Sequence, residues 1–476
     1  MSMPIKNKRF TPSFSILLFI SVIVFIFIAP STLLQGFAPE QQRTVGLLVL
    51  AIYLWTASPL PTGAASIFLL AMMIGLNLVE SVEGAMIGFV SSALYFIMVL
   101  TILSRVLSKV GVDKVIASQL MRLNKRGPKA IVVALPIMMA LLPVLMPSAF
   151  ARLKMLLPFV DRLNDSFGFS EKSIFKKYAM YVIGVMNQNG TMIVYTGGGF
   201  PILAAQLLSD YQIADLSWME WILVVAPPLW TVLIVVNIFA WNYLKYAHGH
   251  QEWDEKGSGV AEEEVHFENR RGKNRFWFVL LTFIIMILIW AFTDSNQLPI
   301  LLPPMLLLVL YSLPRVDLLD NSDIRAFDWE NFLLLGTSFS IGILLEENGT
   351  ASEIANRMLE FLPESAGMLM NIIFVAIVIF LFRMIFVVPS SAIIVIFPVV
   401  ISYANITGIP ALSLGFLVLM IVGGTNIFPI HSPTSYFAFQ TNVLSRKDHY
   451  VIATFSTLMF IMVSIIAAAT YWTLWR

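Results

Sequence analysis

The chain lacks cysteine altogether and has only five histidines and few charged residues. Charged side chains make up 12% of its 476 residues, against 58% hydrophobic ones. Without cysteine there are no disulfides, no thiolate chemistry and no cysteine metal sites. No histidines are paired at ligand spacing within an apolar segment, so the sequence offers no zinc or haem centre. So few polar side chains cannot cover a water-soluble globule.

Apolar segments of nearly membrane-spanning length recur along the chain, and the mean hydropathy is +0.82. About 20 such residues cross the hydrocarbon core of a bilayer. The sequence therefore predicts an all-α polytopic membrane protein embedded in a lipid bilayer. We expect about eleven transmembrane helices, at residues 14–34, 43–58, 61–79, 84–108, 178–208, 219–246, 276–293, 299–313, 329–347, 411–443 and 450–475. The first is longer than the apolar core of a signal peptide, so we expect it to be retained.

Two further apolar segments, 130–165 and 367–406, are each interrupted by a proline beside small hydroxyl residues. The interruptions are at Pro147-Ser148 and at Pro389-Ser390-Ser391. They divide each segment into halves, several of which are too short to span comfortably. Both segments are typical of re-entrant hairpins. Non-helical backbone at membrane depth must line protein or a water-filled cavity, so we expect both hairpin tips to line a site.

The two halves of the chain repeat the same landmarks in the same order. The four pairs are Gly111 and Gly349, Pro147 and Pro389, Pro158 and Pro398, and Gly190 and Gly424. We expect an N-terminal helix and connection (1–42), a first repeat (43–247), a polar cytoplasmic linker (248–275) and a second repeat (276–476). The helix before each hairpin runs in opposite directions, so the repeats are inverted. Inverted repeats with broken helices indicate alternating access around a site near the midplane.

Basic residues gather in the loops of one side. They lie at 6–9, 105–129, 172–177, 270–275 and 446–447, whereas the other side has little beyond Arg43 and Arg357. The positive-inside rule then places the N-terminus in the cytoplasm and the C-terminus outside the cell membrane. The first hairpin enters from the cytoplasm and the second from outside.

Hydroxyl side chains at the breaks suit an anionic or polar ligand. Half-helices that begin after a break direct N–H groups and a positive dipole end into the cavity. The hydroxyl groups that add donors there belong to Ser148, Thr191, Ser390, Ser391 and Thr425. The alternative is that these hydroxyls satisfy carbonyls freed at the breaks.

Arg152 and Arg383 lie within apolar segments beside the two tips. An arginine at membrane depth is costly unless it is paired, solvated or functional. Arg383 could bind a carboxylate with both arms of its guanidinium or replace a bound cation. Arg152 is a candidate because it follows the first tip by four residues. The alternatives are a buried pair between Arg383 and Glu346 or Glu347, and an Arg152 that extends toward the interface.

Amide side chains flank the two later breaks: Asn187, Gln188 and Asn189 precede Gly190, and Asn426 follows Thr425. Their oxygens could coordinate an ion or a substrate, or the amides could join helices by hydrogen bonds. His431 lies near the second break and is a candidate for proton coupling.

Residues 328–336 (DWENFLLLG) and 345–349 (LEENG) resemble the segment before the second hairpin in the divalent anion/sodium symporters. Pro147-Ser148, Ala151-Arg152 and Pro158 resemble the first hairpin of the dicarboxylate exchangers in that family. The resemblance covers nearly the whole chain. It implies eleven spanning helices, two hairpins, and a scaffold domain with a transport domain that moves like an elevator. It also implies a homodimer.

The chain departs from the family at its site. Members carry Ser-Asn-Thr at both tips, whereas the tips here are Ser148-Ala149-Phe150 and Ser390-Ser391-Ala392. The resemblance implies substrate contacts from Ser148, Ala149, Phe150, Arg152, Arg383, Ser390, Ser391, Ala392 and Thr434. It implies sodium ligands among Ser148, Asn187, Asn189, Gly190, Thr191, Thr196, Gly198, Ser390, Gly424, Thr425, Asn426 and Ser432. Sodium is the one cofactor implied, and no other metal.

The sequence therefore predicts a secondary active transporter of a small anion, either a di- or tricarboxylate or sulfate. It is coupled to sodium or protons, or it runs as an exchanger. The alternatives are a carrier of another polar solute without sodium coupling, and an ion channel. We expect no enzyme, because the sequence has no nucleophile triad, HExxH motif or Walker loop. We expect no nucleic-acid partner.

Overall fold

The computed structural model describes residues 34–112, 115, 127–249, 270–293, 298–363 and 365–475. Within these ranges the chain is helical and contains no strand, as expected of an all-α membrane protein. The first predicted transmembrane helix, 14–34, falls almost wholly outside the described residues.

The longer helices are α3 (Pro39–Thr56), α4 (Thr62–Gly75), α6 (Ser92–Lys109), α8 (Pro128–Leu141), α9 (Ala149–Ser166), α10 (Ile174–Tyr181), α12 (Gly199–Asp210), α13 (Trp218–His248), α14 (Arg270–Phe292), α15 (Leu302–Ser312), α17 (Trp329–Glu347), α18 (Thr350–Leu359), α19 (Met368–Ile385), α20 (Pro389–Thr407), α21 (Ala411–Gly424), α22 (Pro433–Gln440) and α23 (Arg446–Ala469). Short elements between them are α5 (Val82–Ala85), η1 (Ile87–Val90), η3 (Leu142–Val144), η4 (Val182–Met186), α11 (Asn187–Gly190), η5 (Thr191–Ile193), η6 (Tyr195–Gly197), α16 (Asn321–Arg325), η7 (Pro429–His431) and η8 (Trp472–Leu474).

Six of the described helices are long and apolar enough to cross a membrane. They are Ser92–Lys109, Trp218–His248, Gly272–Phe292, Met368–Ile385, Pro389–Thr407 and Arg446–Leu474. The apolar helices α4, α15 and α21 are shorter. The multi-pass class is therefore confirmed, whereas the number of eleven spans stays a prediction.

Two predicted spans are not continuous helices. Segment 178–208 changes from α10 into the π-helical η4 and then into short helical turns, and it continues as α12 from the last of three consecutive glycines (197–199). Segment 411–443 ends its first helix at Gly424 and passes through extended backbone at Thr425. It resumes as α22, where Pro433 lacks the N–H that a helix start leaves unpaired anyway. Both breaks thus begin a new helix inside the protein.

The two predicted hairpins each consist of two helices separated at the expected proline. α8 ends before Pro147 and α9 begins after it, with Ser148 as N-cap. α19 ends before Pro389, which is the first residue of α20. Pro158 and Pro398 lie at the same position within α9 and α20. The two hairpins therefore repeat the same local arrangement of helices and prolines.

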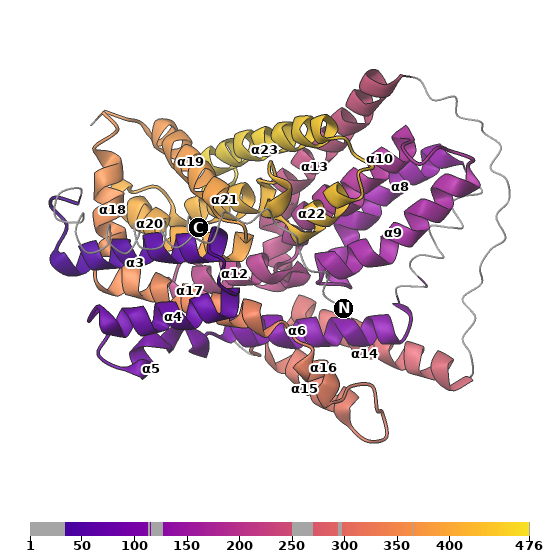
Figure 1. The fold of residues 1–476 in the computed structure, drawn as a ribbon, viewed down its shortest axis with the longest axis horizontal. Coiled ribbons are helices and arrows are strands. Elements are labelled where there is room, and N and C mark those ends of the chain that lie inside the picture. Colours follow the sequence, from indigo (N-terminus) through magenta and orange to yellow (C-terminus); the bar gives the residue numbers. More distant parts are fainter. Residues whose placement is uncertain are drawn as a thin grey trace.

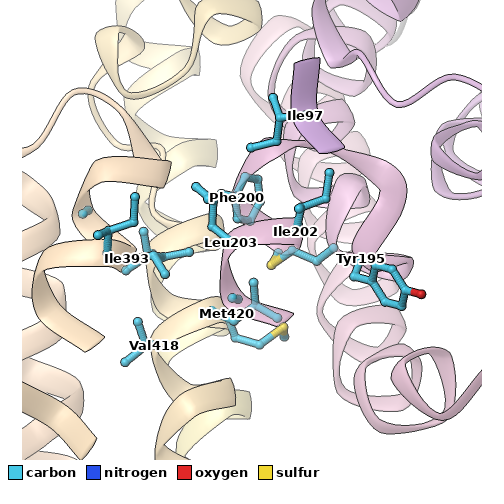
Figure 2. Close-up of a cluster of buried hydrophobic side chains, with 14 of the residues drawn as sticks. Ile97, Tyr195, Phe200, Ile202, Leu203, Ile393, Val418 and Met420 are labelled. Atoms are coloured by element: carbon cyan, nitrogen blue, oxygen red, sulfur yellow. The ribbon is translucent and has the colours of Figure 1, made fainter. Parts of the chain in front are cut away.

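Helices α3, α4, α17 and α18 lie at one end of the molecule, and α8, α9 and α10 lie at the other (Figure 1). Helix α6 runs along one side together with α14, α15 and α16. The hydrophobic core passes through the middle. Figure 2 shows Phe200, Ile202 and Leu203 of α12 between Ile97 of α6 and residues of α20 and α21.

The predicted linker 248–275 is partly helical. His248 is the last residue of α13, and α14 begins at Arg270. Residues 250–269 lie outside the described part of the chain.

Candidate functional site

The first residues of α9, α12, α20 and α22 meet around one cavity of about 260 Å³. These helices follow the two hairpin tips and the two later breaks. The cavity is lined by Ile97, Leu100, Thr101, Pro147, Ser148, Ala149, Phe150, Gln188, Thr191, Gly198, Gly199, Phe200, Ile202, Asn331, Val388, Pro389, Ser390, Pro433 and Thr434. Each hairpin tip was expected to line a site, and residues of both tips line this one cavity.

Two of the four helices begin after a capping serine. Ser148 caps α9 by accepting a hydrogen bond from the N–H of Ala151 (3.3 Å), and Ser432 caps α22 in the same way. At Gly198, an added Cβ would lie 3.2 Å from Thr191 Cβ, so the backbone of Gly198 passes close to the Thr191 side chain. Four positive helix ends around one cavity favour negative charge inside it.

The cavity has polar but uncharged walls. None of its lining side chains is an acid or a base. Its polar side chains belong to Thr101, Ser148, Gln188, Thr191, Asn331, Ser390 and Thr434. An anion here would be bound by hydrogen-bond donors and dipoles rather than by a direct ion pair.

Seven of the predicted site residues line this cavity: Ser148, Ala149, Phe150, Thr191, Gly198, Ser390 and Thr434. The others are buried and do not line it: Arg152, Asn187, Asn189, Gly190, Thr196, Arg383, Ser391, Ala392, Gly424, Thr425, Asn426 and Ser432. Their contacts explain why they do not line the cavity.

Arg152 is fully buried behind the first tip and hydrogen-bonded on three nitrogens. Its Nε donates to Asn187 Oδ1 (2.8 Å) and its Nη2 to the Asn187 carbonyl (3.2 Å), while Nη1 donates to the carbonyl of Met146 just before the tip. The alternative of a side chain that extends to the interface is therefore wrong.

Arg383 is equally buried behind the second tip, and its partners are main-chain carbonyls. Nε donates to Val422 (3.0 Å), Nη2 to His431 (2.8 Å), and Nη1 to Phe386, just before the tip. The alternative of a pair with Glu346 or Glu347 is wrong. Within the described part of the chain neither arginine has an acidic partner.

The amides of the two breaks are bonded to each other. Asn426 Nδ2 donates to Asn189 Oδ1 (2.6 Å), although the two residues lie far apart in sequence. Asn187 bridges differently, since its Nδ2 donates to the Ala149 carbonyl (2.8 Å) while its oxygen accepts from Arg152. These bonds fix the broken helices relative to each other and to the first tip.

Several predicted ion ligands have packing or capping contacts. An added Cβ at Gly190 would lie 2.9 Å from the Met139 carbonyl oxygen, and one at Gly424 only 2.1 Å from Phe460. Thr196 Oγ1 accepts from the indole N–H of Trp218 (3.1 Å). Thr425 donates to the Ile421 carbonyl (2.7 Å), and the Ser432 and Thr434 hydroxyls lie 2.8 Å apart. Ser391 and Ala392 are buried within α20.

His431 is fully buried beside Arg383. Its carbonyl accepts the Arg383 hydrogen bond, and its ring lies edge-on to Phe428. Neither ring nitrogen has a hydrogen-bond partner in the described part of the chain. The ring does not line the cavity, and its role in proton coupling stays a prediction.

Two polar residues of the cavity, Thr101 and Asn331, were not predicted from the sequence. Gln188 was predicted as one of the amides beside the first break, and it lines the cavity. Thr101 and Asn331 come from α6 and α17, far from either tip in sequence. Only the fold brings them there.

These features define a helical membrane protein with an uncharged polar cavity between paired helix breaks. The sequence profile of the family described as "Sodium:sulfate symporter transmembrane region" matches residues 10–475. The chain belongs to this family of divalent anion:sodium symporters, so it is an anion transporter rather than an enzyme.

Two relatives agree with this assignment. A protein of Bacillus subtilis (strain 168) named "Putative malate transporter YflS" is 22% identical over 346 residues, which cover 71% of this chain and 70% of the relative. A protein of Cupriavidus necator named "Membrane protein" is 19% identical over 219 residues, covering 43% of this chain and 42% of the relative.

Proposed function

We propose that the chain exchanges small dianions, dicarboxylates first among them, across the cell membrane without sodium. The observation that carries this proposal is the pair of fully buried arginines behind an uncharged cavity ringed by four helix N-termini. The helix ends and hydroxyls bind the anion, and the arginines supply fixed positive charge close behind them.

The arginines take the oxygen atoms that a bound cation would need. Each guanidinium collects three oxygen acceptors, including a carbonyl just before a tip. Carbonyl and amide oxygens are also the ligands that hard cations prefer. A guanidinium stays protonated in proteins. The tips therefore have permanent cations, and the residues present do not fit sodium sites at the same places.

Fixed charges favour exchange over one-way transport. The empty site leaves two buried positive charges without an acidic partner, and moving them through a low-dielectric region is costly. A bound dianion balances both charges. The loaded protein then changes state readily and the empty one does not, so substrate moves out only as substrate moves in.

Hydrogen bonds divide the described helices into two groups. The hairpin group, α8–α13 and α19–α23, is joined by the Asn189–Asn426 bond, by both arginines and by the bond from Trp472 Nε1 to the Val224 carbonyl (3.1 Å). The flanking group, α3–α6 and α14–α18, is joined by Lys109 and Asp323 (2.6 Å) and by Asn348 and Thr44 (2.7 Å).

Few polar contacts cross the boundary between these groups. Ser92 Oγ donates to Gln206 Oε1 (2.6 Å) and Ser352 to Ser402 (3.4 Å), while Tyr211 lies near Glu346. A mostly apolar boundary allows sliding at low cost. We propose that the hairpin group is the transport domain of an elevator and that the flanking group is its scaffold.

The size of the cavity supports a small substrate. About 260 Å³ is below the roughly 300–1,000 Å³ typical of pockets for drug-sized ligands. The name of the Bacillus subtilis relative refers to malate, a four-carbon dicarboxylate. We propose malate or succinate as the substrate, ahead of citrate or sulfate.

The membrane arrangement is proposed as follows. Eleven helices span the membrane and two hairpins are re-entrant. The N-terminus is cytoplasmic and the C-terminus outside, the repeats are inverted, and the scaffold group forms a homodimer. Basic residues at 105–109, 172–177 and 446–447 support this orientation.

Uptake of labelled anions into proteoliposomes tests the function. Succinate, malate, citrate, tartrate and sulfate are each offered outside, with the same unlabelled anion inside. We expect saturable exchange of a four-carbon dicarboxylate. Exchange of sulfate alone would refute the substrate class, and a unitary current in planar bilayers would refute a carrier.

A further inference from the structure

The cavity has one wall that does not belong to the hairpin group. Ile97, Leu100 and Thr101 of α6 and Asn331 of α17 line it together with the hairpin tips. Asn331 is the only one of these four with an amide side chain. If the two groups move against each other during transport, the hairpin tips stay with the substrate. The substrate then loses its contacts with this wall.

Asn331 is free to bind. It is the third residue of α17, and its main-chain N–H is used by the Asp328 cap (3.1 Å). Its half-buried side chain has no hydrogen-bond partner among the residues that the structure describes. Gln188, which lines the same cavity, also has an unbonded side-chain amide there. Each amide offers two N–H donors, which suit a carboxylate.

The remainder of α17 has no second amide side chain. Thr337 donates to the Ser66 carbonyl, Ser338 to the Leu334 carbonyl, and Ser340 accepts from the Gly88 N–H. Glu346, near the opposite end, is a carboxylate that can only accept when ionised. An anion displaced along α17 by more than about one turn, roughly 5.4 Å, therefore loses Asn331 without a substitute.

We propose that Asn331 is a substrate ligand in one end state only and thereby sets the affinity for the dianion on one face of the membrane. This inference rests on the proposed elevator transport. With α17 beginning on the cytoplasmic side, the state described here faces the cytoplasm, and Asn331 acts on substrate that binds from there.

Transport kinetics measured separately from the two faces test the inference. For Asn331→Ala we expect the half-saturating malate concentration at the cytoplasmic face to rise roughly tenfold, as for the loss of a hydrogen bond to a charged group. Asn331→Asp should raise it further by repelling the dianion. At the outer face both variants should stay within about twofold of the unmodified chain. Glu330→Gln, at the exposed neighbouring residue, is the matched control.

A second measurement does not depend on transport. Because the chain has no cysteine, Asn331→Cys introduces a single thiol. A membrane-impermeant maleimide should label it in inverted vesicles but not in intact cells, and malate should slow the labelling several-fold. Glu330→Cys should be labelled from the same face without protection by malate.

The outcomes separate the two proposals. Equal labelling of Asn331→Cys from both faces, no protection by malate, or equal kinetic shifts at both faces would each overturn the role of Asn331. If the unmodified chain exchanges no dianion, the proposed function fails, and the labelled face still reports where the side chain is accessible.

Discussion

Arg152 and Arg383 are the residues on which the proposed mechanism depends most directly. Each is buried without an acidic partner in the described chain, and each holds a carbonyl just before a hairpin tip. The sequence identified both as candidates because a charge is expensive at membrane depth. It could not identify their partners, because main-chain carbonyls from distant helices are invisible in a sequence.

Arg383→Gln tests the fixed charge. Glutamine removes the positive charge and leaves at least one of the carbonyls of Phe386, Val422 and His431 unbonded. We expect malate exchange to be abolished while the protein still elutes as a single species in size-exclusion chromatography. Arg383→Lys keeps the charge but reaches fewer acceptors, so it should retain part of the activity. Exchange by Arg383→Gln at the normal rate would show that the charge is dispensable.

Gly424 was predicted as an ion ligand, and its contacts indicate a packing role in addition. An added Cβ would lie 2.1 Å from Phe460, so α21 and α23 would have to separate. Gly424→Ala should therefore lower the midpoint of thermal unfolding by several degrees. Gly75→Ala is the matched control, because Gly75 also ends a helix and has nothing within 4 Å of the added atom. Equal midpoints for both variants would contradict the packing role.

At the scale of elements, the four helix starts around the cavity favour negative charge inside it. Proline and hydroxyl residues predicted the starts of α9 and α20 from sequence alone. Breaks beside Gly190 and Thr425 were also predicted, but the starts of α12 at Gly199 and of α22 at Pro433 were not. What the sequence did not reveal is that α6 and α17 complete the cavity, since neither has a break or an unusual residue at Thr101 or Asn331.

Ser148→Asp separates helix stability from anion binding. Aspartate is as good an N-cap as serine, so α9 should keep its stability. Its carboxylate would repel a dianion, so we expect malate exchange to fall at least tenfold with an unchanged thermal midpoint. Ser217→Asp, at the exposed start of α13, is the control and should exchange normally. Normal exchange by Ser148→Asp would contradict an anion site at this tip.

One buried cluster of charged side chains joins three helices of the hairpin group. Lys177 of α10, His248 of α13 and Asp448 of α23 lie within 3.6 Å of one another, and the side chains of Lys177 and Asp448 are 7% and 2% exposed. Asp448→Asn leaves a buried lysine without its carboxylate, which costs up to about 3 kcal/mol. The midpoint of thermal unfolding should therefore fall clearly. Asp161→Asn breaks the more exposed pair with Lys176 and should have little effect. Similar shifts for both would refute a structural role for the cluster.

At the scale of the whole molecule, the sequence predicted the class, the family and a site lined by each hairpin tip. The reason is physical: apolar length, breaks by proline and glycine, and repeated spacing are all local signals. The boundary between the hairpin and flanking groups was not predictable, because it depends on which distant helices share hydrogen bonds. The pair Asn189 and Asn426 shows this, since their mutual bond joins the two repeats.

We propose that fixed arginines make this chain an exchanger that does not need sodium. The most direct measurement compares malate uptake into empty and malate-loaded proteoliposomes, each with and without an inward sodium gradient. We predict uptake only into loaded vesicles, at the same rate with sodium or with a potassium substitute. Uptake into empty vesicles that requires the sodium gradient would contradict the account.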